Sequence, residues 1–207
     1  MTSKILMVAA ALGLSSMAAQ ATTISSIDMT VRTSNYVVTG SETASTLLSE
    51  FYSSGSEVCS TTVAAIDNVG SSQTCGGPNR NIATLFNINI DASGPLRFQF
   101  GGDWGRGGVI FGRNGINGTV GPYAEDVWWN RDWSNSDVIG FTLTRAATGT
   151  ISLLGFEGCC GGGMSLRYSA DDGETWNIVA STVPAPGSLA LIGLGLLGLG
   201  MARRKQA

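Results

Sequence analysis

The sequence contains no histidine. A Ser-His-Asp or Cys-His catalytic centre is therefore excluded, and a zinc site would lack imidazole ligands. The chain has no internal repeat, which disfavours a propeller or a solenoid. No nucleotide or cofactor fingerprint is present, so we expect no cofactor. These absences point away from the common enzyme classes.

Lysine is missing from the long central part of the chain. Between Thr22 and Thr182 there are eight arginines and no lysine, against all fifteen acidic residues of the sequence. The formal charge of this part is therefore −7. Because an acidic domain repels phosphate backbones, we expect no nucleic-acid partner. Its length of about 160 residues suits one domain with a hydrophobic core.

The N-terminal residues have the layout of a secretory signal peptide. Lys4 precedes the apolar stretch Ile5 to Leu14, and the small-residue pattern Ala19-Gln20-Ala21 follows. Positive charge, a short apolar core and an A-x-A site are the three parts of such a signal. We expect residues 1–21 to be a signal peptide that is cleaved after Ala21. The protein is then exported.

The C-terminal end carries an apolar segment closed by a basic cluster. Pro184 to Ala202 are nineteen residues without a charge, followed by Arg203, Arg204 and Lys205. As a helix they would span about 28 Å, close to the thickness of the hydrocarbon layer. The cluster then acts as a stop on the cytoplasmic side of the inner membrane. Several glycines weaken this helix, which suits a temporary anchor that is later cut.

A proline motif precedes this segment and makes the tail resemble a known sorting signal. Val183, Pro184, Pro186 and Gly187, with the apolar run and the basic end, resemble the PEP-CTERM sorting tail of Gram-negative bacteria, with Ala185 where glutamate is usual. The resemblance covers residues 183–207. It implies recognition by an exosortase-type processing protease and cleavage near the prolines. It also implies an inner-membrane intermediate and delivery to the envelope surface or an exopolysaccharide (biofilm) matrix.

The pattern of residues 22–182 predicts a mainly β fold. Apolar residues at helical spacing predict one short helix within residues 41–53. Elsewhere the apolar period is two, and turn residues separate the alternating segments. We expect three hairpins, formed by residues 84–90 with 96–100, 141–145 with 150–156, and 164–169 with 175–179. Together they indicate an antiparallel β-sandwich or a jelly-roll-like ectodomain, with a long loop over residues 101–137 in which Val109 to Phe111 could add a strand.

Four cysteines in an exported chain favour disulfides, and four allow three pairings. We favour Cys59–Cys75, because the segment between them is a local loop rich in turn residues. That choice leaves the adjacent residues Cys159 and Cys160 to pair with each other. The alternative, in which each of these two bonds to a different distant cysteine, stays open.

Four tryptophans are concentrated in or beside the long loop: Trp104, Trp128, Trp129 and Trp133. Exposed indoles flanked by Asn, Asp and Arg suit sugar rings, so these residues are candidate contacts with a glycan. Tryptophan is mostly buried on average, and we expect at least two of the four to fill the core. Extracellular polysaccharide is therefore a candidate partner.

Several acidic residues invite other interpretations. Residues 169–176, SADDGETW, resemble the Asp-box of sialidases and related β-proteins, a device that locks a hairpin. Asp132 and Asp137, or Asp171 and Asp172, could offer oxygen ligands to calcium, but acidic turns are ordinarily just solvated and we expect no metal site. Paired carboxylates could hydrolyse a glycoside. The candidates for such a pair are Asp103, Glu125, Asp126 and Asp132.

The sequence therefore predicts three parts: a signal peptide (1–21), a β-sandwich ectodomain (22–182) and a transmembrane sorting tail (183–207). The predicted function is that of a non-enzymatic, exported surface or matrix protein that is structural or binds polysaccharide. The alternative is a hydrolase that acts on glycosides. Release of reducing sugar from a matrix polymer would separate the two.

Overall fold

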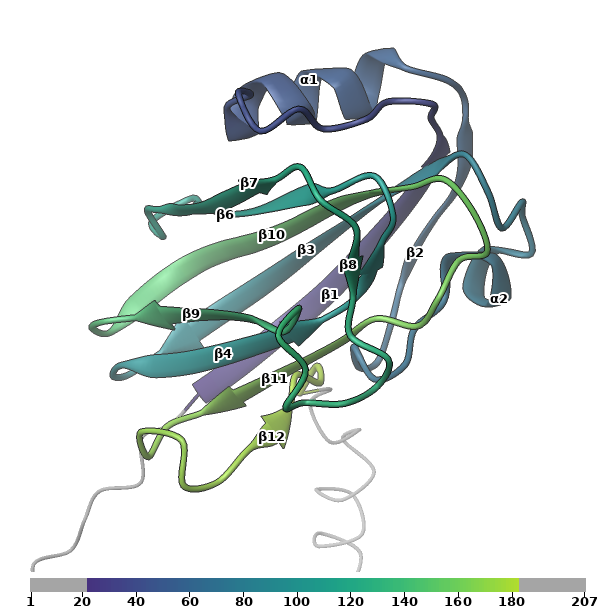
Figure 1. Cartoon of the computed structure of the whole chain (residues 1–207). Helices are drawn as coiled ribbons and strands as arrows, with labels where there is room; N and C mark the ends of the chain where they lie inside the picture. Colours follow the sequence, from purple (N-terminus) through teal and green to yellow (C-terminus); the bar gives the residue numbers. More distant parts are fainter. Residues whose placement is uncertain (1–21, 183–207) are drawn as a thin grey trace, which may run out of the picture.

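The structure, a computed structural model, describes residues 22–182, which form two large antiparallel sheets, a short two-stranded ribbon and two helices (Figure 1). The predicted signal peptide and sorting tail lie outside these residues. The larger sheet has six strands in the order β2 (Glu57–Thr62), β1 (Thr22–Thr33), β3 (Ile82–Ala92), β10 (Ala147–Glu157), β6 (Gly108–Arg113) and β7 (Thr119–Tyr123). The smaller sheet has the order β12 (Asn177–Ile178), β11 (Ser165–Ser169), β4 (Leu96–Gly101) and β9 (Ile139–Leu143). The prediction of a mainly β, antiparallel fold is confirmed.

The main core lies between the two sheets. Because side chains alternate between the faces of a strand, one set from each sheet points inward. Phe86, Ile88 and Ile90 of β3 and Phe98 and Phe100 of β4 are buried in this shared core. The apolar side chains that interdigitate in this core are the main stabilising contribution.

Two of the three predicted hairpins are wrong. β3 and β4 belong to different sheets, as do β9 and β10, so each connection crosses from one sheet to the other. β3 pairs instead with β1 and β10, and β4 pairs with β11 and β9. The alternating pattern is the same whether two strands lie side by side or face each other across a core. The third hairpin, β11 with β12, is confirmed.

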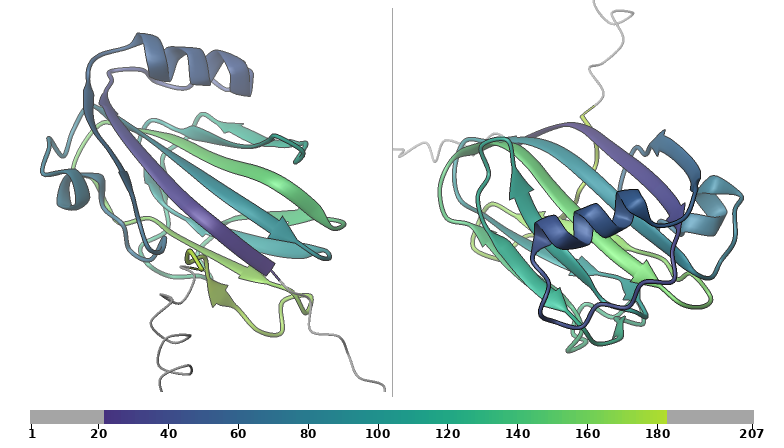
Figure 2. Two further views of the ribbon diagram at one scale, coloured as in Figure 1. Left: turned by 180° about the vertical axis from the view of Figure 1, so that it is seen from behind. Right: turned by 90° about the horizontal axis from the view of Figure 1, so that it is seen from above.

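A helix covers the outer face of the larger sheet. In α1 (Ala44–Ser53), Leu47 and Phe51 are fully buried against apolar side chains of β3, β6 and β10. Figure 2 shows α1 lying across these strands, so the architecture has three layers. Thr43 caps the helix, since its hydroxyl accepts a hydrogen bond from the Thr46 amide at 3.2 Å. The predicted helix is thus confirmed, beginning at Ala44.

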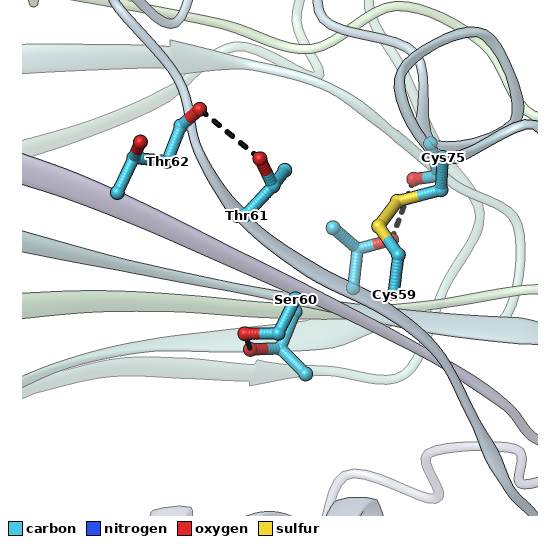
Figure 3. Close-up of a disulfide and its surroundings, with 8 residues drawn as sticks. Cys59, Ser60, Thr61, Thr62 and Cys75 are labelled. Carbon is cyan, nitrogen blue, oxygen red and sulfur yellow. Dashed lines mark hydrogen bonds between the residues drawn. A yellow bond between two sulfur atoms is a disulfide. The ribbon is translucent and has the colours of Figure 1, made fainter.

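A second, five-residue helix, α2 (Ser71–Cys75), was not predicted. It lies in the segment between two cysteines, and its last residue is bonded to Cys59 of β2 (Figure 3). The bond ties α2 to an edge strand of the larger sheet. The prediction of a Cys59–Cys75 disulfide is confirmed. Cys159 is bonded to Cys160, so no cysteine is free.

The two ends of the described part lie side by side. The amide and hydroxyl of Thr182 both donate to the carbonyl of Ile24, at 2.8 and 3.0 Å. Within residues 22–182, neither helix is long and apolar enough to cross a bilayer.

Candidate functional site

A short two-stranded ribbon positions the first residues of the site. β5 (Asp103–Trp104) pairs with β8 (Val127–Trp128), with Asp103 opposite Trp128 and Trp104 opposite Val127. Cross-strand partners share a face of the ribbon, so Asp103 and Trp128 lie on one side and Trp104 and Val127 on the other. The first side faces solvent and the second faces the core.

Trp104 belongs to the core and is not a glycan contact. Its side chain is only 2% exposed and packs against Phe100, with ring centroids 4.5 Å apart. Space for the indole comes from Gly108 and Gly155, because a Cβ at either position would overlap the ring. The prediction that Trp104 contacts a glycan is therefore corrected. Its indole fills space that Gly108 and Gly155 leave in the core.

Hydrogen bonds from backbone amides to aspartate side chains fix the shape of the loop after β8. The Asp132 carboxylate accepts from the Ser134 amide at 2.9 Å, and Asp137 accepts from the Trp128 amide at 3.1 Å. This loop folds Trp129 back over Gly101, where the indole is 5% exposed and donates to the Gly163 carbonyl at 3.1 Å. Trp129 is thus a buried wall of the site, with little surface for a ligand.

The ribbon and the loop enclose a pocket of about 200 Å³, which we call the tryptophan pocket. Trp128 stands at it with 56% of its surface exposed, a large value for a side chain of this size. The lining combines a carboxyl, an amide and a guanidinium with aromatic surface: Asp103, Trp128, Trp129, Asn130, Arg131, Gly162 and Gly163.

Backbone strain gathers at the same place. Within residues 22–182, seven residues other than glycine have a positive φ, and five of them are Asn or Asp, which tolerate it. The other two are Arg131 (φ 57°), which lines the tryptophan pocket, and Cys160 (φ 76°), which begins the segment leading to Gly162 and Gly163. Strain of this kind persists where surrounding structure enforces it and is common at binding sites.

Asp103, which lines the pocket, is paired with a second carboxyl group behind it. Asp103 is hydrogen-bonded to Glu157, which is 6% exposed and accepts from the amides of Gly105 (3.0 Å) and Cys159 (2.7 Å). Burial, followed by the charge and hydrogen bond of Glu157, raises the pKa of Asp103 to about 7. Glu157 was not among the predicted site residues. The only feature of the sequence that could have indicated Glu157 is that it is a single acidic residue at the end of the largely apolar strand β10.

This pair does not have the geometry of a glycosidase. Catalytic carboxyls in those enzymes stand about 5–5.5 Å or 6.5–9.5 Å apart, so that a sugar or water fits between them. Asp103 and Glu157 are in direct contact. The other predicted candidates lie elsewhere: Glu125 and Asp126 line a separate cavity of about 340 Å³ with Asp137, and Asp132 is exposed in the loop.

The pH dependence of stability tests the pair. The folded state holds the Asp103 proton up to about pH 7, whereas the unfolded chain releases it near pH 4. The free energy of unfolding should therefore fall as the pH rises from about 4 to 7. Asp103→Asn should flatten this slope, because the amide stays neutral. Urea denaturation at several pH values measures it.

Asp132→Asn is the matched control, since Asp132 is exposed and its hydrogen bonds to Ser134 lower its pKa. Asp132 therefore does not titrate between about pH 4 and 7, and Asp132→Asn should keep the pH dependence of the unsubstituted protein. Equal slopes for Asp103→Asn and the unsubstituted protein would refute the raised pKa of Asp103.

Beyond Trp129, aromatic side chains continue across the outer face of the smaller sheet. The rings of Trp129 and Trp133 lie 4.6 Å apart, and the guanidinium of Arg167 lies 4.1 Å from Trp133 and 4.6 Å from Trp176. Arg167 also donates twice to Oε1 of Gln99, at 2.9 and 2.6 Å. We call Trp133, Arg167 and Trp176 the arginine stack. It extends the tryptophan pocket into a half-exposed strip.

The Asp-box residues form a closed turn at the far end of this strip. Asp171 accepts from the Thr175 amide (2.9 Å) and the Ser169 hydroxyl (2.7 Å), which, with the Thr175 hydroxyl, hold its pKa at about 2. Asp172 is paired with Arg97 at 2.7 Å. Among residues 22–182, no three His, Cys, Asp or Glu side chains gather as metal ligands.

Comparison with known proteins identifies the sorting signal. The family model of the PEP-CTERM protein-sorting motif matches residues 182–205, which include the predicted proline motif and basic cluster. The chain therefore carries a C-terminal signal that implies export through a membrane-anchored, exosortase-processed precursor. It is a PEP-CTERM sorting domain-containing protein. No curated protein matches it in sequence.

Solved structures show a distant likeness. The epithelial adhesin 9 A domain of Candida glabrata, solved with Galβ1-4GlcNAc, has a TM-score of 0.46 and 10% identity, covering 77% of this chain and 90% of its own. The PA14 sugar-binding domain of an RTX adhesin (TM-score 0.45, 9% identity) covers 76% and 98%. The PA14 domain of the antifreeze protein MpAFP (0.45, 11%) covers 78% and 92%. Likeness at this level says nothing about the ligand of this chain.

Proposed function

We propose that residues 22–182 are a non-enzymatic polysaccharide-binding domain of an exported protein. The observation that carries the proposal is the exposed indole of Trp128 beside a pocket lined by Asp103, Asn130 and Arg131. An indole left in water is an apolar surface without a partner. Such a surface suits the C–H face of a sugar ring, while the polar lining suits its hydroxyls.

The charge state of the pocket supports a neutral or weakly charged ligand. Below about pH 7 the carboxyl of Asp103 keeps its proton in the hydrogen bond with Glu157, and its oxygens can still accept a hydrogen bond from a hydroxyl. Asn130 offers both donor and acceptor atoms, and Arg131 offers donors. This mixture matches the donor and acceptor character of sugar hydroxyls.

The arginine stack favours a chain over a single sugar. It continues from Trp129 along the smaller sheet, so further sugar units have half-exposed aromatic surface beside them. The direct contact between Asp103 and Glu157 supports binding without hydrolysis.

The experiment compares Trp128→Ala with Tyr52→Ala, which removes another exposed aromatic residue from α1 in the opposite layer. With polysaccharide extracted from the matrix of the producing cells, Trp128→Ala should lower affinity at least about tenfold, the loss of one hot-spot contact. Tyr52→Ala should bind normally. Failure of the unsubstituted protein to bind this polymer would end the proposal, and release of reducing sugar from it would favour a hydrolase.

We also propose the processing of the chain as the sequence predicts it. Residues 1–21 are removed as a signal peptide, and the chain is cut near Pro184 and Pro186 before it reaches the cell surface or the matrix. The intact mass of the mature protein locates both ends. A mature form that retains Arg203 to Lys205 would contradict this proposal.

A further inference from the structure

Residues 159–163, Cys-Cys-Gly-Gly-Gly, hold the tryptophan pocket together through their backbone. The Cys159 amide donates to Glu157 Oε1 at 2.7 Å. Gly162 lies directly against the Asp103 carboxyl, and the Gly163 carbonyl accepts from the Trp129 indole at 3.1 Å. One five-residue segment therefore sets the positions of both carboxyls and of the buried tryptophan wall.

This segment is packed through its backbone alone, with Gly161 against Asn79 and Gly163 against Asn68. It lies between the end of β10 at Glu157 and the start of β11 at Ser165, outside both sheets. Its three glycines carry no side chains to pack, and glycine has more conformational freedom to lose than any other residue. Cys160 and Gly161 both have positive φ values, 76° and 43°. A conformation of this kind needs a constraint.

The constraint within the segment itself is the bond between Cys159 and Cys160. It closes a small ring that contains the peptide joining the two residues, so it restricts the backbone where the segment leaves β10. Both cysteines are exposed, which makes the bond accessible to a reductant from solution. Cys59 and Cys75, by contrast, are each half-buried and lie on β2 and α2.

We propose that the Cys159–Cys160 disulfide is a positioning element of the tryptophan pocket and that its reduction by a small dithiol loosens the pocket while the fold persists. The dithiol supplies two electrons and two protons. The sulfur–sulfur bond becomes two thiols, and the dithiol is oxidised to its own disulfide. The effect on polysaccharide affinity rests on the proposed function, whereas the effect on the geometry of the pocket does not.

Two pairs of substitutions separate this role from general stability. Cys159→Ser with Cys160→Ser should lower affinity for the extracted matrix polysaccharide at least tenfold and leave the melting temperature nearly unchanged. Cys59→Ser with Cys75→Ser should lower the melting temperature and keep the affinity. Normal binding by the first double variant would overturn the role in recognition.

A second readout needs no ligand. The ¹⁵N indole resonance of Trp129 should shift and its proton should exchange faster when dithiothreitol reduces the Cys59→Ser/Cys75→Ser protein, whose remaining disulfide is the vicinal one. The Trp176 indole should stay unchanged. Should that variant not fold, the Cys159→Ser/Cys160→Ser protein is compared with the unsubstituted one. An unmoved Trp129 resonance refutes the positioning role, whereas a moved resonance without any polysaccharide binding refutes only the proposed function.

Discussion

Truncation of Phe51 to alanine should lower the free energy of unfolding by about 3–5 kcal/mol, the usual loss for a fully buried phenylalanine. Its side chain is 0% exposed and fills the space between α1 and the outer face of the larger sheet. Phe51 is the largest side chain that α1 buries against the sheet, so the residues around it cannot fully close the cavity left by its removal. Urea denaturation followed by circular dichroism measures the change.

Tyr52→Ala is the matched control for this substitution. Tyr52 is the next residue of the same helix and is 54% exposed, so it shares the helical environment without the burial. Its truncation should change stability by no more than about 0.5 kcal/mol. If Phe51→Ala lowers the free energy of unfolding by no more than Tyr52→Ala, the packing of α1 on the sheet does not stabilise the domain as we expect.

The second large effect concerns the Cys59–Cys75 disulfide. Replacing both cysteines with serine should destabilise the domain by about 3 kcal/mol, because a closed loop of this length restricts the unfolded chain. For a domain of this size the melting temperature should fall by about 6–12 °C. Differential scanning calorimetry of oxidised protein measures it.

The vicinal pair provides the control for that measurement. Cys159 and Cys160 are adjacent in sequence, so their bond closes no long loop and scarcely restricts the unfolded chain. Serine at both positions should leave the melting temperature within about 3 °C of its original value, which is about 1 kcal/mol. Equal losses from the two double variants would contradict the loop-closure explanation.

Periodicity revealed the strands but not their partners. Phe86, Ile88 and Ile90 alternate with asparagine because one face of β3 meets the core and the other meets solvent or α1. The same alternation occurs in β4, which faces β3 across the core and belongs to the other sheet. A turn sequence between two alternating segments cannot tell a hairpin from a crossing. That choice depends on β1 and β10, which are distant in sequence and occupy both edges of β3.

Only part of the candidate site could be predicted, because the rest depends on contacts between residues that are distant in sequence. The cluster of tryptophans contains two residues of the candidate site, since Trp128 and Trp129 both line the pocket. The sequence could not show that Trp104 points inward, because Gly155, which makes room for it, lies on β10. Nor could it show that Glu157 meets Asp103, a contact between residues more than fifty positions apart. Tertiary contacts of this kind leave no local pattern.

The hydrogen bonds from Thr182 to the Ile24 carbonyl bring the entry and exit of the domain to one point on its surface. A domain whose ends lie this close together can be inserted into a loop of another protein without separating the residues on either side of that loop. By the same reasoning, its native ends can be joined by a short linker and new ones opened elsewhere. In Figure 1 both ends of residues 22–182 lie at the lower side of the sandwich, away from the layer formed by α1.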